Sequence, residues 1–128
     1  MNEALRCRGI RGATTVADDS RASILEGTRE LLSRMISANQ IVPEETAAIF
    51  FTATADLSAT FPARAARELG LVDVPLMCSQ EIPVADAPVR CIRVLLLINT
   101  SKRPEEIVHV YLRGAAALRS DLNQSKGR

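Results

Sequence analysis

One arginine interrupts the most apolar stretch of the sequence. Arg93 lies within residues 91–99, where apolar residues occupy both alternating sets of positions, as in a strand with two buried faces. An unpaired charge in such a strand would cost several kcal/mol. Arg93 therefore needs an anion, which is either an internal partner such as Glu81 or Asp73 or the negative charge of a ligand bound in a cleft. The residues alone leave both possibilities open.

Three further arginines have spacings that suit anion binding. Arg11 lies between Gly9 and Gly12, where a predicted strand gives way to a loop and a side chain can reach into a pocket. Arg64 and Arg67 are three residues apart and share one face of a predicted helix. Arginine forms planar, two-pronged bonds with carboxylates, which suits an acidic ligand. Each could equally be an ordinary surface residue.

Cysteine and histidine are too sparse for a metal site. Cys7, Cys78 and Cys91 lack the spacing of zinc ligands, and His109 is the only histidine. We expect no metal. The same scarcity leaves no Ser-His-Asp or Cys-His relay, unless His109 meets a nucleophile in space. A single histidine is more often structural.

Composition excludes several classes of partner. Sixteen basic and fifteen acidic residues leave a formal net charge of +1, and the chain has three Phe, one Tyr and no Trp, so we expect no nucleic-acid binding. The longest apolar run, 94–98, is far shorter than the roughly 20 residues of a membrane helix. The first residues also do not resemble a secretory signal. We therefore expect no membrane association and a cytoplasmic location.

The 128 residues suffice for one domain, and their patterns predict strands and helices mixed in one sheet. Ser20–Asn39 carries an apolar stripe of helical period, and Asp18-Asp19-Ser20 supplies cap candidates. Residues 91–99 should form a central strand that is covered on both sides. The fold class is therefore α+β, with a single mixed β-sheet domain over residues 1–128.

The remaining elements follow from shorter patterns. We expect strands over about 5–12, 47–54 and 72–77 and a last strand within 111–118, a helix from a Ser58 cap to Leu69, short helical starts at Pro43 and Pro104, a loop over 81–88, and a frayed polar tail over 119–128.

Six short segments, taken in order, resemble a known family. They are Arg8-Gly9-Ile10-Arg11-Gly12-Ala13-Thr14-Thr15, Phe61-Pro62-Ala63, Ala66-Arg67-Glu68-Leu69, Cys78-Ser79-Gln80-Glu81, Cys91-Ile92-Arg93-Val94 and His109-Val110-Tyr111-Leu112. Together they resemble the monofunctional, trimeric pseudo-α/β-barrel class of chorismate mutase, from about Arg8 to Leu122. The resemblance implies a homotrimer with active sites between subunits and no cofactor. It implies a Claisen rearrangement of chorismate to prephenate, on the route to phenylalanine and tyrosine.

The resemblance also implies roles for individual residues. Arg93 would bond the ether oxygen and a carboxylate of the substrate, and Glu81 would accept the hydrogen bond of the ring hydroxyl and oppose the developing positive charge. The other substrate-binding residues would be Arg11 and Tyr111 on a carboxylate, Met77, Cys78, Ser79 and Gln80 along the pocket, Leu118 as an apolar wall, and Phe61, Ala63, Arg64 and Arg67, which would reach the cleft of a neighbouring subunit.

This chain departs from the family pattern in three places. Residues 70–73 form a segment one residue shorter than expected, Arg64 stands where a lysine is familiar, and Ser79 replaces a bulkier apolar residue. Two alternatives are a trimeric imine deaminase of similar pseudo-barrel fold and a non-catalytic trimeric module that binds an aromatic acid. Turnover of chorismate separates the three functions.

Overall fold

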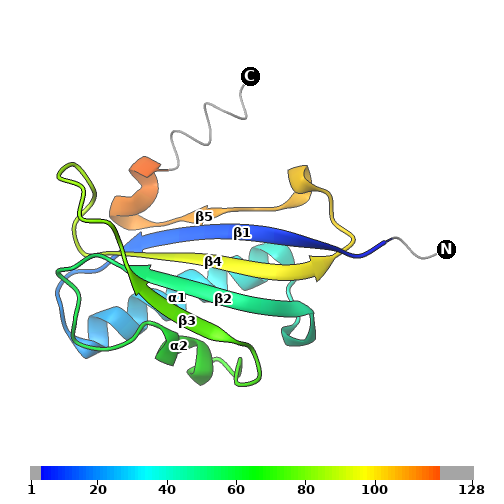
Figure 1. Cartoon of the computed structure of the whole chain (residues 1–128), viewed down its shortest axis with the longest axis horizontal. Helices are drawn as coiled ribbons and strands as arrows, with labels where there is room; N and C mark the ends of the chain where they lie inside the picture. The colour runs from blue at the N-terminus through cyan, green and yellow to red at the C-terminus, as the bar shows by residue number, and fades with distance from the viewer. Residues whose placement is uncertain (1–3, 119–128) are drawn as a thin grey trace.

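The computed structural model describes residues 4–118, which form one five-stranded sheet with helices on one face (Figure 1). The strands are β1 (Arg6–Thr15), β2 (Thr46–Ala53), β3 (Leu76–Gln80), β4 (Cys91–Thr100) and β5 (Val110–Tyr111), and the helices are α1 (Arg21–Asn39) and α2 (Ala63–Glu68), with 3₁₀ turns η1 (Pro43–Glu45), η2 (Pro104–Glu106) and η3 (Arg113–Ala115). The strand order is β3-β2-β4-β1-β5. Strand β4 pairs antiparallel with β1 and β2, whereas β3 and β5 are added in parallel at the two edges. The predicted mixed sheet is confirmed.

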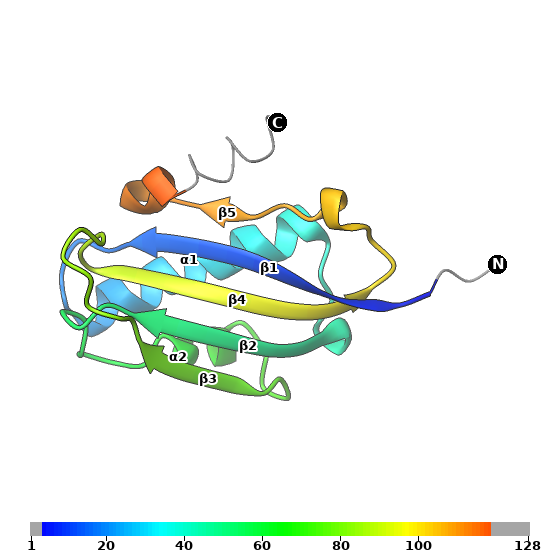
Figure 2. The ribbon, with the colours of Figure 1, turned by 45° about the horizontal axis from the view of Figure 1, so that its top comes forward.

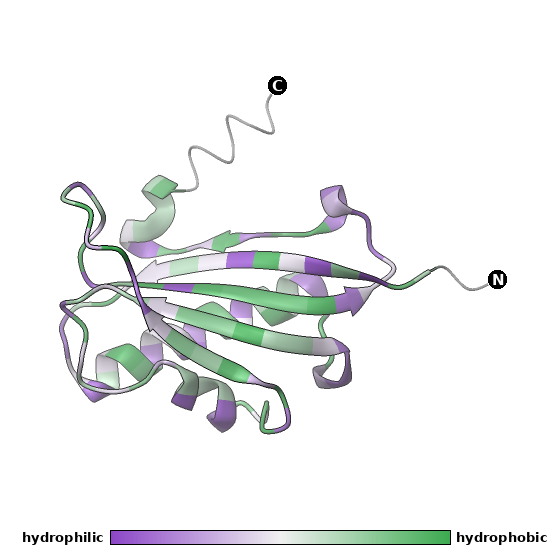
Figure 3. Ribbon diagram, in the orientation of Figure 1, coloured by the Kyte–Doolittle hydropathy of each residue, from purple (hydrophilic) through white to green (hydrophobic). Residues whose placement is uncertain are grey.

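The central strand is buried on one face and open on the other. In β4, Ile92, Val94, Leu96 and Ile98 are buried, whereas Arg93 and Leu95 are exposed. Figure 2 shows α1 and α2 together behind the sheet. The prediction that β4 is covered on both sides is therefore wrong for the single chain, because the helices form one layer. Figure 3 shows that the middle of the sheet, along β2 and β4, is mainly apolar.

Helix α1 supplies most of the cover for the sheet. Its buried apolar residues Ile24, Leu25, Leu31, Leu32 and Met35 follow the predicted stripe. The hydroxyl oxygen of Ser20 accepts the N–H of Ser23 at 3.1 Å, so the predicted cap is confirmed. The helix ends at Asn39, as predicted, and Gln40 follows in the left-handed region at φ 50°.

The predicted Ser58 cap is wrong. Helix α2 begins at Ala63, after Pro62. The carboxylate of Asp19 instead accepts both the Ser58 N–H at 2.9 Å and the Ala59 N–H at 3.0 Å. These bonds tie residues 58–59 to the residue that precedes the cap of α1, and the chain stays non-helical from 58 to 62.

Three strand boundaries also differ from the prediction. Strand β1 continues to Thr15, because β4 provides partners along its whole length, so Arg11 lies in mid-strand opposite Leu95 rather than at a strand end. Strand β3 begins at Leu76, just after Pro75, instead of at residue 72. The last strand has two residues and gives way to η3. The predicted loop over 81–88 is confirmed, and the predicted tail over 119–128 lies outside the described residues.

Candidate active site

A cationic and an anionic side chain meet at the end of the open face of the sheet. Backbone pairing places Ala13, Arg93, Thr52 and Ser79 in one row across four strands. The hydroxyl of Thr52 donates to Oε2 of Glu81, and Nε of Arg93 lies 3.6 Å from the same oxygen. Glu81 is thus the internal partner of Arg93. The Arg93 side chain is nevertheless 52% exposed, against 22% for Glu81, so the guanidinium also faces solvent.

These two charges line a cleft of about 270 Å³. Leu118 forms part of its wall, and the loop after Glu81 contributes Ile82, Val84 and Pro88. The cleft combines a cation, an anion and apolar surface, which is an arrangement that binds a polar, partly apolar molecule with charge of both signs. Cys91 also lines it, and burial raises the pKa of this thiol. The thiol therefore stays protonated at neutral pH and is a poor nucleophile.

Arg11 and Tyr111 lie beside this cleft on neighbouring strands. Arg11 is exposed on the same face as Arg93, two residue pairs further along the β1–β4 ladder. Tyr111 and Leu118 both pack against the buried cluster of Ala13, Cys91 and Ala115. The backbone N–H of Arg11 donates to Nδ1 of His109 at 2.9 Å, which gives this histidine the structural role expected of it.

The second group of predicted residues lines a different cavity. This cavity measures about 480 Å³ and lies between the end of β3 and the loop before α2. Among the predicted site residues it contains Phe61, Arg64, Cys78, Ser79 and Gln80. Thr54 lines both this cavity and the cleft of Arg93.

Besides Arg11 and Tyr111, three predicted residues lie outside both cavities. Met77 is exposed on the open face of the sheet, opposite Phe50. Arg67 is exposed on α2, and Ala63 is buried in the main core cluster. The expected site residues are thus divided within a single chain between two cavities, exposed surface and, for Ala63, the core.

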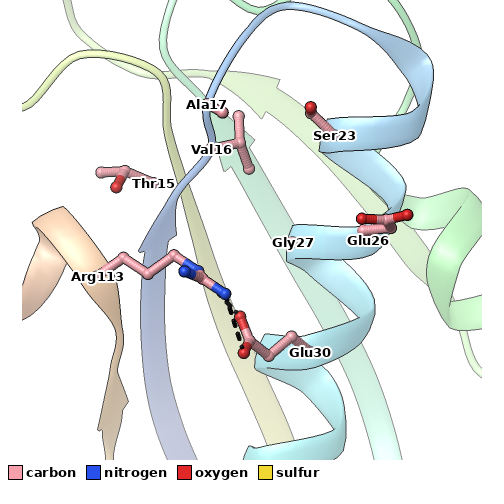
Figure 4. A pocket seen from close by; sticks show the side chains of 8 residues that line it. All are labelled: Thr15, Val16, Ala17, Ser23, Glu26, Gly27, Glu30 and Arg113. Carbon is pink, nitrogen blue, oxygen red and sulfur yellow. Dashed lines mark hydrogen bonds and ion pairs between the residues drawn. The ribbon is translucent and has the colours of Figure 1, made fainter.

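A third groove was not foreseen from the sequence. It measures about 560 Å³ and lies between the end of β1, the first turns of α1 and η3 (Figure 4). Arg113 crosses to Glu30 there, with Nε and Nη2 at 3.2 and 3.3 Å from the two carboxylate oxygens. These residues belong to no pattern that singles them out in the sequence, because they come from distant segments.

Two kinds of feature are absent from residues 4–118. Within this range no three His, Cys, Asp or Glu residues lie together as a metal would require. Across the same residues, no helix has the length and apolar character needed to cross a membrane.

Comparison with known proteins decides the family. The profile of the family described as chorismate mutase type I matches residues 7–122. This chain belongs to that family. It is 49% identical over 120 residues to chorismate mutase AroH of Thermus thermophilus, covering 93% of this chain and 98% of the relative. It is 44% identical to AroH of Bacillus subtilis strain 168, covering 93% and 94%.

A solved structure confirms the fold of the family. A chorismate mutase from Clostridium thermocellum superposes with a TM-score of 0.85 at 44% identity, covering 86% of this chain and 98% of that one. The predicted resemblance to the pseudo-α/β-barrel class is therefore confirmed, and the protein is an isomerase of the chorismate mutase family. The imine deaminase and the non-catalytic binding module are not favoured by these matches.

Proposed function

We propose that this chain rearranges chorismate to prephenate in the cleft of Arg93 and Glu81, with these two side chains as its catalytic residues. The single observation that carries the proposal is their arrangement: opposite charges 3.6 Å apart, with the cation half exposed, at the wall of a 270 Å³ cleft. The rearrangement is intramolecular. It needs no proton transfer and no covalent bond to the protein, so position and charge must supply the acceleration.

The charges of the cleft match those of the transition state. As the ether C–O bond breaks ahead of C–C formation, negative charge develops on the oxygen and positive charge on the ring. Arg93 would donate to that oxygen and to a carboxylate, because a guanidinium has five N–H donors and only its Nε is directed at Glu81. Glu81, held by the Thr52 hydroxyl, would face the ring. Even a millionfold acceleration corresponds to about 8 kcal/mol of barrier lowering.

The neighbours of this pair would hold the substrate. Arg11 presents a second guanidinium on the same face and would bind a carboxylate, with Tyr111 beside it. Leu118 would pack against the apolar part of the ring, since it already forms wall in the cleft. Arg11 lines neither cavity of the single chain, so this assignment depends on a further surface closing over it.

A neighbouring subunit would supply that surface. We propose a homotrimer in which Phe61, Ala63, Arg64 and Arg67 reach the cleft of the next chain. Met77, Cys78, Ser79 and Gln80 would line the pocket from β3. One feature of the sheet supports assembly. Phe50, Met77 and Leu95 are exposed together on the uncovered face of the sheet, and an apolar patch of this kind is typical of interfaces. A mass measurement in solution tests the trimer, and a monomer with full activity would exclude it.

The remaining part of the proposal concerns the setting of the protein. Cys7, Cys78 and Cys91 are all free thiols, the state that a reducing cytoplasm maintains. We place the protein there, as one domain over residues 1–128, in the synthesis of phenylalanine and tyrosine.

The decisive experiment is an assay on chorismate. Purified protein is mixed with chorismate, the loss of chorismate absorbance is followed, and the product is identified. Formation of prephenate supports the proposal. Binding without turnover would indicate the non-catalytic module, and turnover of an imine with none of chorismate would indicate the deaminase. The same assay on Arg93→Ala tests the role of the guanidinium. Arg103→Ala is its matched control, because Arg103 is an exposed arginine that pairs with Glu105 and does not line the cleft.

A further inference from the structure

A short segment joins two residues of the proposed site. Tyr111 ends β5, and Leu118 lines the cleft of Arg93. Strand β5 has two residues, and its register pairs Val110 with Gly12 and Tyr111 with Ala13. So short a strand forms few ladder hydrogen bonds. The direction in which the chain leaves it, and hence the position of Leu118, must be fixed by other contacts.

Two contacts hold this segment against the end of β1. The N–H of Leu112 donates to the carbonyl oxygen of Ala13 at 2.9 Å, and the N–H of Gly114 donates to the hydroxyl oxygen of Thr15 at 3.0 Å. The approach at Gly114 is so close that a Cβ there would lie 2.8 Å from Thr15 Oγ1. Only glycine therefore fits. Both hydrogen bonds lie on β1. On the side of the helices the segment is held by apolar packing, since Val110 and Leu112 pack against the main core cluster, which includes Leu31 and Met35 of α1.

Arg113 provides a third contact, and it reaches the helix. Its backbone has φ 51°, in the left-handed region that non-glycine residues rarely adopt. From this conformation its side chain extends to Glu30 on α1, where two N–H groups bond the two carboxylate oxygens at 3.2 and 3.3 Å (Figure 4). The pair lines the 560 Å³ groove, whose lining shares no residue with that of the cleft of Arg93. Neither residue lines the cleft itself.

We propose that the Arg113–Glu30 pair is a positioning device for the proposed active site. It fixes the tilt of η3 against α1, and through η3 it sets Tyr111 and Leu118 at the distance from Arg93 that substrate binding requires. The buried Ala115 transmits the position of η3 to the site, because it packs in one cluster with Ala13 and Cys91. Tyr111 and Leu118 pack against the same cluster. The inference rests on the proposed function of the cleft, and it adds two residues that do not touch the substrate.

The test compares two carboxylates on the same helix. Glu30→Gln removes the charge that Arg113 binds. Glu26→Gln is the matched control, because Glu26 lies one turn earlier, lines the same groove and is not bonded to Arg113. The pair is partly exposed, at 63% for Arg113 and 33% for Glu30, so its contribution is modest. We expect Glu30→Gln to raise KM for chorismate about two- to fivefold. We expect kcat to change little, because Arg93 and Glu81 are not moved. Glu26→Gln should leave both constants unchanged.

Two variants of Arg113 separate the ion pair from the backbone conformation. Arg113→Gly accepts φ 51° without strain and loses the pair, so it should raise KM as Glu30→Gln does. Arg113→Lys keeps the charge with a single-pronged donor and should give an intermediate KM. The melting temperature of each variant is measured alongside.

The outcomes separate this inference from the proposed function. An unchanged KM in both Glu30→Gln and Arg113→Gly would overturn the positioning role, as would an equal rise in Glu26→Gln. A rise in KM accompanied by a large fall in both kcat and melting temperature would show general destabilisation. That result would overturn the positioning role too. A wild-type protein that does not convert chorismate would overturn the proposed function itself.

Discussion

Replacing Arg93 with lysine is the sharpest test of the proposed chemistry, because the change keeps the charge and removes the planar fork. In the structure Nε of Arg93 lies 3.6 Å from Glu81, and the rest of the guanidinium is available to the substrate. An ammonium group cannot face Glu81, the ether oxygen and a carboxylate together. Loss of one donor that stabilises transition-state charge typically costs about 10²–10³ in kcat, or about 2.7–4 kcal/mol. We therefore expect kcat to fall at least about 100-fold.

The fold should survive this change. The Arg93 side chain is 52% exposed, and an ion pair in that setting contributes at most about 1 kcal/mol to stability. The melting temperature should therefore fall by less than about 8 °C. Initial rates at saturating chorismate measure kcat, and circular dichroism measures the melt. Arg103→Lys, at an exposed surface pair, is the matched control. A folded Arg93→Lys protein with near-normal kcat would remove Arg93 from the mechanism.

Four further predictions concern pH, a thiol and packing. Because the rearrangement moves no proton to or from the protein, kcat should be flat across about pH 6–8; a bell-shaped profile would implicate the histidine or a cysteine instead. Cys78→Ser should retain most of the turnover, since the thiol is proposed as pocket wall, and abolished activity would point to nucleophilic chemistry. Gly12→Ala should lower the free energy of unfolding by about 1–3 kcal/mol, because the new Cβ would lie 2.4 Å from Sδ of the buried Met35; an unchanged denaturation midpoint would show that Met35 moves aside freely. The Thr54 hydroxyl, together with the N–H of Arg90, lowers the pKa of Asp56 below its usual value of 3.8. The stability that Asp56 contributes is therefore fully present above pH 3.8. It is lost as the pH falls through the lowered pKa of the folded state. Asp56→Asn should flatten this acid limb of stability, and identical acid unfolding curves would contradict the assignment.

Local sequence patterns correctly predicted the elements that bury one face against a single neighbouring layer. The stripe of α1 and its Ser20 cap are local features, and the structure has both. The alternation in β4 correctly indicated a central strand. It did not indicate what covers each face, because apolar residues such as Leu95 on a face left open by the helices look the same in sequence as buried ones.

The parts that failed depend on contacts between distant segments. In the sequence Ser58 has the residue type of a helix cap. In the structure it lies in a loop, where its N–H donates to Asp19, the residue before the cap of α1. The resemblance assigned Phe61 to the cleft of a neighbouring subunit, and Phe61 and Glu81 do line separate cavities of the single chain; the motifs alone could not show where those cavities lie. The Arg113–Glu30 pair was missed for the same reason, since spacing within a sequence does not report which helix a distant turn approaches.

The pairing of β1 with β4 sets the order of events during synthesis. Strand β1 leaves the ribosome first, yet its partner along all ten residues is a strand near the opposite end of the described chain. At about 5–20 residues per second, translation leaves β1 waiting several seconds with the later-buried Ile10 and Ala13 uncovered. The entropy cost of closing so long a loop arises before the hydrogen bonds of the β1–β4 ladder can offset it. Completion of the sheet is therefore a late step, which must wait until β4 has been synthesised.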